Sequence, residues 1–279
     1  MVFGDKKELN RKYVFKLGKE IVNQTRNEIL LGTIVANSKV ELQRCFKKRI
    51  DICKCMLYAA QSIGSYTVPL NPIVATTIYW EACIPKLLYG LEITDIDENT
   101  MIDLEIFHFE AAKHCQGLPT NTSNYGALVT IGWKTLGAQC DIIRLLFMWR
   151  LLSLSMLCLY KRILISRLIE IFTNDNQKCI GPTQMLVETC KKYGLLNVLK
   201  VSVMNGEYMS MCKWKKMVIE SVTVRDIKRI NIACSLYKVL AYLHESNVSM
   251  VSLWWQHTFR NIKFMRINRT IIRILLNVQ

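Results

Sequence analysis

The sequence predicts a mainly α-helical protein, because three of its properties favour helices over sheets. Hydrophobic residues make up 51% of the 279 positions, which is enough for substantial cores. Only 12 glycines and 5 prolines occur, too few for a disordered chain or for a turn-rich β protein. Leucine, isoleucine, methionine, lysine and arginine are prominent, and apolar residues recur at helical spacing along most of the chain.

Residues 1–37 depart from this pattern. Short apolar pieces alternate there with charged residues, and Ile29–Val35 is rich in β-branched residues around Gly32. Such a stretch suits a strand or a hairpin arm. A few short strands cannot fold alone, so we expect this region to be the end of a domain that begins upstream of Met1.

Residues 38–119 are predicted to form a first helical region. Ser38 and Glu41 match a capping box, which starts a helix that Gly64 ends. Its predicted buried stripe, at steps of three and four, is Leu42, Phe46, Ile50, Cys53, Leu57 and Ala60. Its predicted cationic side carries Arg44, Lys47, Lys48 and Lys54, which is either a phosphate-tracking face or an ordinary solvated face.

Two more helices are expected before residue 120. Asn71-Pro72 opens the first, and Pro85 is expected to kink or restart it. The second runs from about Thr100 to Cys115 and ends at Gly117. Its polar residues are interpreted as a solvated face and as structural or surface histidines: Asp103, Glu105, Glu110, His108 and His114.

Residues 120–279 are predicted to form a second helical region after the polar loop Thr120–Asn124. Helices are expected at about 135–154 and 156–172. A further helix is expected to end at Gly194, and two more are expected at about 213–222 and 224–243. The uncharged run Leu151–Tyr160 is only ten residues long, whereas a membrane span needs about 20 apolar residues. We therefore expect a buried helix there.

The charge of the chain is strongly positive, with 37 basic against 22 acidic residues and a net charge of +15. Such a surplus favours a polyanionic partner, although a protein with a merely basic surface is the alternative. No acidic residue follows Glu245. The candidate nucleic-acid-binding residues are Lys47, Lys48, Lys54, Arg260, Lys263, Arg266, Arg269 and Arg273. Trp254, Trp255 or Tyr125 could stack on bases, but burial in the core is the favoured interpretation.

The eleven cysteines do not form a disulfide framework or a zinc motif, because no Cys-x2-Cys pair occurs and the four histidines do not complete a ligand spacing. Met1–Asn10 lacks the features of a signal peptide. We therefore expect an intracellular, reducing compartment, such as cytoplasm or nucleus, without secretion and without a bound metal. No nucleophile–base pair or phosphate loop is visible, so neither catalytic residues nor a small-molecule substrate are predicted.

Several short motifs, in their order and spacing, resemble the reverse transcriptase of LINE-type, jockey-like non-LTR retrotransposons downstream of its catalytic palm. The likeness covers nearly the whole chain; it is best from about 30 to 155 and looser after 180. The motifs are Leu31-Gly32-Thr33-Ile34, Ala59-Ala60-Gln61-Ser62-Ile63-Gly64, Pro85–Glu92, Ala112–Pro119, Gly132-Trp133 and Leu146-Phe147-Met148-Trp149-Arg150.

The resemblance implies a role for each region. Residues 1–37 would be the end of the palm, with Leu31 and Gly32 at a turn that helps to hold the primer end. Residues 38–119 would be a thumb-like helical region and 120–279 a helical connector. The implied partners are RNA or an RNA/DNA hybrid, and the palm and endonuclease domains of a full-length parent.

One departure from this family concerns catalysis. Polymerases of this class hold two Mg²⁺ ions with paired palm aspartates, and no Asp-Asp pair occurs in this sequence. Mg²⁺ would therefore belong to the missing palm, and we expect this chain alone not to polymerise DNA. Two alternatives to a nucleic-acid-binding fragment stay open: a non-functional open reading frame of a decayed element, and a membrane-associated helical protein built on Leu145–Leu168.

Overall fold

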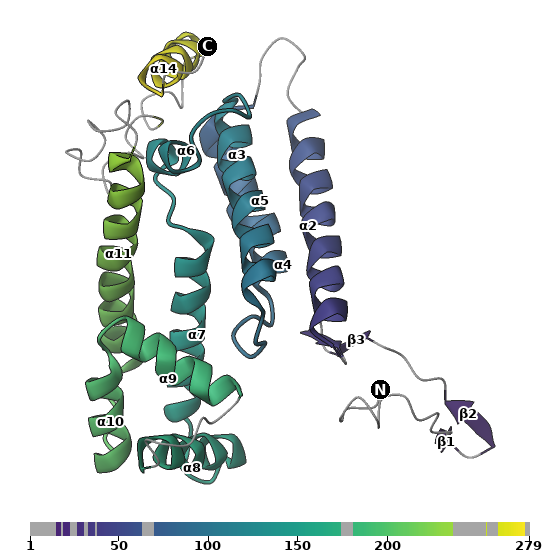
Figure 1. Cartoon of the computed structure of the whole chain (residues 1–279), viewed down its shortest axis with the longest axis vertical. Helices are drawn as coiled ribbons and strands as arrows, with labels where there is room; N and C mark the ends of the chain where they lie inside the picture. The colour runs from purple at the N-terminus through teal and green to yellow at the C-terminus, as the bar shows by residue number, and fades with distance from the viewer. Residues whose placement is uncertain are drawn as a thin grey trace.

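The protein is mainly helical, as the sequence predicts (Figure 1). The structure is a computed structural model that describes residues 15–17, 19–22, 27–30, 33–36, 38–62, 70–173, 181–236, 255 and 262–276. The strands are β1 (Phe15–Leu17), β2 (Glu20–Val22), β3 (Asn27–Leu30) and β4 (Thr33–Ala36). The helices are α2 (Lys39–Ser62), α3 (Pro72–Ile78), η1 (Tyr79–Cys83), α4 (Ile84–Leu88), α5 (Glu98–Gln116), α6 (Asn124–Ile131), α7 (Leu136–Leu152), α8 (Leu159–Thr173), α9 (Pro182–Lys192), α10 (Leu196–Asn205), α11 (Met211–Ser235) and α14 (Ile262–Leu275).

The strands form two antiparallel hairpins. β1 pairs with β2, and β3 pairs with β4 in a register that sets Asn27 opposite Ala36. The hairpin expected around Gly32 is therefore confirmed, although Leu31 and Gly32 themselves lie outside the described residues. The origin of these strands in a polymerase palm stays a prediction.

A first core lies among α2 to α6. Phe46, Ile50, Cys53 and Leu57 of α2 are buried in it, which confirms most of the predicted stripe. Residues far along the chain complete this core, because Trp255, the α14 side chains Met265 and Ile272, and Leu276 directly after α14 are buried against it. The first core is thus made from both halves of the sequence.

A second core lies among α7 to α11 and is continuous in sequence. Its centre is the stacked pair Trp149 and Trp214, whose ring centroids are 4.0 Å apart at an interplanar angle of 10°. Both indole N–H groups are satisfied, since Trp149 donates to the Met209 carbonyl and Trp214 donates to the Leu145 carbonyl, each at 3.1 Å. Large aromatic rings therefore fill this core without leaving a polar atom unpaired.

Helix α7 belongs to both cores. Its first residue, Leu136, and also Cys140 pack into the first core, whereas Ile142 and Leu145 pack into the second. The boundary between two helical regions expected at residue 120 stays a prediction. The division of the buried side chains between the two cores falls within α7.

Two local features differ from expectation. The kink expected at Pro85 is a π-helical turn, η1, between α3 and α4; proline has no N–H to donate to the preceding turn, which favours such a widening. The two helices expected at 213–222 and 224–243 are wrong as separate elements, because α11 runs unbroken through this boundary. A buried residue recurs at every fourth position of α11, so one face of the continuous helix lies in the protein interior. These residues are Trp214, Val218, Val222, Asp226, Ile230 and Cys234.

The apolar stretch at 145–168 is divided between two helices. α7 ends at Leu152 and α8 begins at Leu159, which confirms the separate helices expected at about 135–154 and 156–172. The uncharged run forms the corner between them, so the buried helix expected for that run is wrong. Across the described residues, no helix combines the length and the apolarity that crossing a bilayer requires.

Candidate nucleic-acid interface

The predicted basic residues fall on two helices, α2 and α14. Lys47 and Lys48 are exposed on α2, and Lys54 is partly exposed two turns further along. Arg266 and Arg273 are exposed on α14, and Arg269 is partly buried. Arg260 lies outside the described residues, and Lys263 lies in α14 but its side chain is not described.

Lys54 contacts α5 instead of standing free. Its Nζ atom lies 2.8 Å from Oε2 of Glu110, and this hydrogen bond raises the pKa of Lys54. One turn further along α5, Lys113 Nζ donates to the Thr120 carbonyl at 2.8 Å, and burial lowers the pKa of Lys113. These two lysines line a pocket of about 380 Å³ together with Tyr58, Glu110 and His114.

Two arginines of α14 cap the C-terminal end of α5. Arg269 Nε donates to the Gln116 carbonyl at 2.9 Å, and Arg273 Nη2 donates to the Gly117 carbonyl at 2.8 Å. Carbonyls at a helix C-terminus have no partner within the helix and carry partial negative charge, so cations are favoured there. Burial and the charge of Arg273 lower the pKa of Arg269.

Gly117 makes this cap possible. Its φ of +64° lies in the left-handed region, which ends α5 and which side chains rarely adopt. A Cβ atom at this position would lie 2.9 Å from the Arg269 guanidinium carbon. The glycine therefore provides both the backbone turn and the space for the arginine.

Gln116 fixes the same end of α5 from inside. Its Nε2 donates to the carbonyls of Ala112 and Ala127, at 2.9 and 2.8 Å. Its Oε1 accepts from Thr130 Oγ1 at 2.8 Å and from Trp255 Nε1 at 3.2 Å. A glutamine amide has two donors and two acceptor sites, so this fully buried side chain is completely satisfied and joins α5, α6 and Trp255.

These contacts bring part of the predicted set together. Lys54, Arg269 and Arg273 all touch the last two turns of α5, where Lys113 also lies. At 1.5 Å per residue, Glu110 and Gly117 are only about 10 Å apart along the helix axis. Lys47 and Lys48 extend the basic surface along α2 by a similar distance. We call this set of cations on α2, α5 and α14 the basic path.

The sequence prediction missed Lys113 and was wrong for Glu105, whereas the burial favoured for Trp255 is confirmed. Trp255 is buried, as favoured, so its ring is not available for stacking on bases. Glu105 is not on a solvated face: it is 8% exposed, and burial raises its pKa. The basic stretch after residue 260 contains the helix α14, whose regular apolar spacing was the signal available in the sequence.

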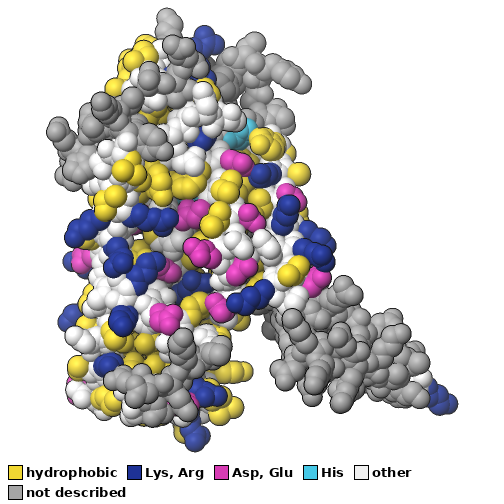
Figure 2. Space-filling view, in the orientation of Figure 1, with side chains coloured by type: hydrophobic (Ala, Val, Ile, Leu, Met, Phe, Trp, Pro, Cys, Tyr) yellow, Lys and Arg dark blue, Asp and Glu magenta, His cyan; other side chains and the backbone are white. Residues whose placement is uncertain are grey.

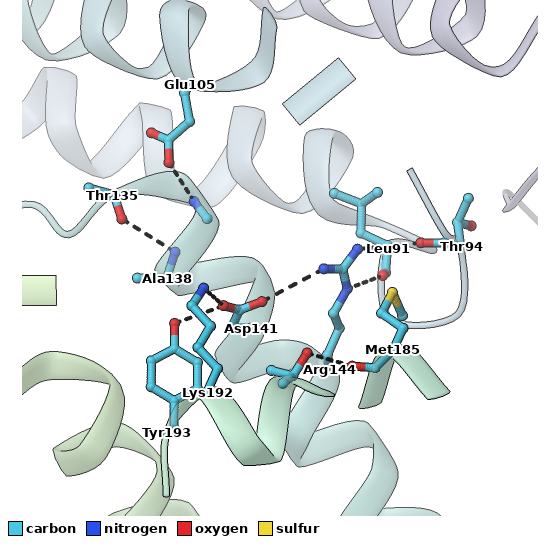
Figure 3. A network of polar contacts seen from close by, with 12 residues as sticks. Leu91, Thr94, Glu105, Thr135, Ala138, Asp141, Arg144, Met185, Lys192 and Tyr193 are labelled. Carbon is cyan, nitrogen blue, oxygen red and sulfur yellow. Dashed lines mark hydrogen bonds and ion pairs between the residues drawn. The ribbon is translucent and has the colours of Figure 1, made fainter. Parts of the chain in front are cut away.

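Glu105 belongs to a polar junction between the two cores, which Figure 3 shows. Its carboxylate accepts from the backbone N–H of Leu136 at 3.2 Å and of Gly137 at 2.8 Å. Asp226 accepts from Thr135 N at 3.0 Å and from Thr135 Oγ1 at 2.6 Å. Two buried carboxylates thus satisfy the N-terminus of α7, where negative charge is favoured.

The rest of the junction consists of paired charges (Figure 3). Asp141 binds Lys192 Nζ at 2.6 Å and the Tyr193 hydroxyl at 2.7 Å, and its other oxygen lies 3.7 Å from Arg144. Arg144 also donates to the carbonyls of Leu91 and Thr94. These charges have partners inside the protein, so the junction holds the helices together.

No metal site is apparent at the junction or elsewhere in the described part of the chain, where no group of three or more His, Cys, Asp or Glu residues lies close enough to hold an ion. Asp97 serves as the N-cap of α5 by accepting from Thr100 N at 3.0 Å.

Comparison with known proteins adds no identification, since no family model, curated protein or solved structure matches the chain.

Proposed function

We propose that the chain binds RNA or an RNA/DNA hybrid through the basic path, as the thumb and connector part of a retrotransposon-type reverse transcriptase. The observation that carries the proposal is the gathering of Lys54, Lys113, Arg269 and Arg273 around the end of α5, in a chain with a net charge of +15. Cations that three helices hold at fixed positions can neutralise several phosphates at once.

The arginines can serve both as caps and as phosphate ligands. A guanidinium carries five N–H donors, and the contacts of Arg269 and Arg273 with the Gln116 and Gly117 carbonyls each use one of them. The remaining donors fit the geometry of phosphate oxygens, which arginine binds in pairs. Lys47 and Lys48 would extend the contact along α2.

Salt-dependent binding tests this proposal. Fluorescence anisotropy with labelled RNA and RNA/DNA hybrid, between about 50 and 200 mM salt, should give a log–log slope of roughly −0.7 to −0.9 per phosphate neutralised. Replacing Lys47 and Lys48 by glutamine should reduce this slope and weaken binding. Both residues are exposed on α2, so their replacement should not disturb the core.

The matched control is the removal of two exposed lysines at the start of α11, Lys213→Gln with Lys215→Gln. It makes the same change in net charge outside the basic path. Equal weakening by both double variants would show that binding follows net charge alone and would contradict the proposed surface. A slope near zero for the unmodified protein would contradict nucleic-acid binding itself.

The lineage and the expected lack of polymerase activity need separate tests. The transcript and genomic DNA immediately 5′ of the Met1 codon should encode an in-frame palm with paired aspartates. Stop codons there would instead support a decayed element. Primer extension by the isolated chain with Mg²⁺ should give no product, and product formation would overturn the expectation of inactivity.

A further inference from the structure

The corner between α7 and α8 presents large apolar side chains to solvent. We define the α7–α8 corner as residues 153–163, at the end of the molecule's long axis opposite α14 (Figure 1). Leu157 is 93% exposed and Tyr160 is 70% exposed. The six exposed apolar residues are Leu154, Met156, Leu157, Leu159, Tyr160 and Ile163. Figure 2 shows hydrophobic side chains gathered at this end.

The corner is a built structure. Ser153 ends α7 by donating its N–H and its hydroxyl to the Trp149 carbonyl, at 2.9 and 2.8 Å. Lys161 is only 6% exposed; its Nζ donates to the Leu154 carbonyl at 2.9 Å and lies 4.5 Å from the centre of the Tyr208 ring. Leu164 and Leu168 anchor α8 in the second core. The apolar side chains are therefore held outward by a fixed backbone.

The charge around the corner is mainly positive. No acidic residue occurs between Asp141 and Glu170, whereas Arg150, Arg162 and Arg167 are exposed. Arg162, Ser166 and Arg167 line a shallow hollow on α8 of about 590 Å³, beside Leu159 and Ile163. Glu170 also lines it and pairs with Arg167 at 2.9 Å. Guanidinium and hydroxyl donors beside apolar side chains match a lipid, which joins a phosphate to acyl chains.

We propose that the α7–α8 corner docks on an anionic membrane surface, with Met156 and Leu157 entering the acyl boundary and Arg150 and Arg162 contacting lipid phosphates. Exposed apolar side chains with flanking cations are the combination that binds such surfaces without spanning them. A second copy of the chain is a poorer occupant, because a two-fold contact would bring the same arginines together. This proposal is independent of nucleic-acid binding.

Vesicle co-sedimentation of the full chain tests the docking surface. Phosphatidylcholine vesicles that contain about one third phosphatidylserine should bind the protein at least ~10-fold better than pure phosphatidylcholine vesicles. Met156→Ser with Leu157→Ser should abolish binding, because these side chains supply the apolar contact. The matched control, Ile232→Ser with Leu236→Ser, changes two exposed apolar residues of the α11 end and should bind as the unmodified protein does.

A second readout locates the contact. Tryptophan introduced as Leu157→Trp should shift its fluorescence to shorter wavelength when the phosphatidylserine vesicles are added, and Leu236→Trp should not. The proposal is overturned if the unmodified protein stays in the supernatant, or if Lys47→Gln with Lys48→Gln lowers binding as much as the corner variant does. It is also overturned if the corner variant removes self-association in analytical ultracentrifugation, because a second copy would then cover the patch.

Discussion

The two cores are built in opposite ways. The second core takes its buried side chains from one continuous stretch, residues 138–222, and is centred on two stacked indoles. The first core needs Trp255 and α14 from the far end of the chain, and the polar side chains buried beside it include His108, Gln116 and Thr130. We infer that the second core, whose segments are close in sequence, depends on apolar packing. The first core, which α14 joins from far along the chain, depends on specific polar contacts. Four changes test that difference, from the largest expected effect to the smallest.

Trp214→Ala should have the largest effect and should act on the second core. It removes a fully buried indole, its stack on Trp149 and its hydrogen bond, so we expect a loss of about 4 kcal/mol in the free energy of unfolding. Urea unfolding measures this loss. Hydrogen exchange should show lost protection mainly in residues 138–222; equal loss in both cores would show that they unfold as one unit.

Gln116→Met should cost about 3 kcal/mol and act on the first core. Methionine keeps the volume but removes the hydrogen bonds that Gln116 makes with the carbonyls of Ala112 and Ala127, the Thr130 hydroxyl and the Trp255 indole. We expect Trp255 and α14 to lose exchange protection before α5 does. Unchanged protection of α14 would mean that its two arginine contacts suffice to hold it.

Acid should destabilise the first core through His108. This ring is fully buried between the Tyr79 hydroxyl, 2.8 Å from Nδ1, and the Lys134 carbonyl, 2.9 Å from Nε2. Burial lowers its pKa to about 4, against 6.5 for an ordinary histidine. Since the folded state disfavours the charged form, the stability contribution is complete above pH 6.5 and is lost as the pH falls toward 4.

The expected loss between pH 7 and pH 5 is about 2 kcal/mol. Urea unfolding at several pH values measures it, and His108→Gln should remove most of this slope. A proton titration of His108 by NMR gives an independent check: a midpoint near 6.5 would contradict the assignment.

Asp226→Asn should have the smallest effect, about 1 kcal/mol, because asparagine retains one of the two acceptor oxygens. Asp226 is of interest because it ties α11 to the start of α7, and both of these helices contribute buried side chains to the two cores. We expect the urea transitions of the two cores to separate further in this variant. A single unbroken transition would show that Glu105 alone maintains the junction.

The sequence is sufficient for local features of the fold and insufficient for its long-range contacts. The Ser38 cap is confirmed, as Glu41 N donates to Ser38 Oγ at 3.3 Å, and the stop at Gly117 is confirmed by its left-handed backbone. Both depend on residues within one or two turns. The unbroken α11 was missed, although its buried residues recur at every fourth position straight through the β-branched run Val222, Thr223 and Val224.

The candidate site was harder to predict for the same reason. Two contacts of the site join residues that are distant in sequence: Lys54 with Glu110, and Arg269 with Gln116. No local sequence pattern indicates that these residues meet. Residue type and charge indicated which side chains to consider. Only the fold shows that Arg269 and Arg273 cap α5 and that Lys113 joins them.

The closure of the first core by α14 has a consequence for synthesis on the ribosome. Residues 138–222 have all been made before Trp255 is added, so the core that comes second in the sequence can be finished first. At 5–20 residues per second, the end of α5 waits about 8 to 30 seconds after its own translation for the arginines that cap it. During that interval the nascent chain exposes the apolar surface that α14 later covers, which makes this the stage at which a chaperone would be needed.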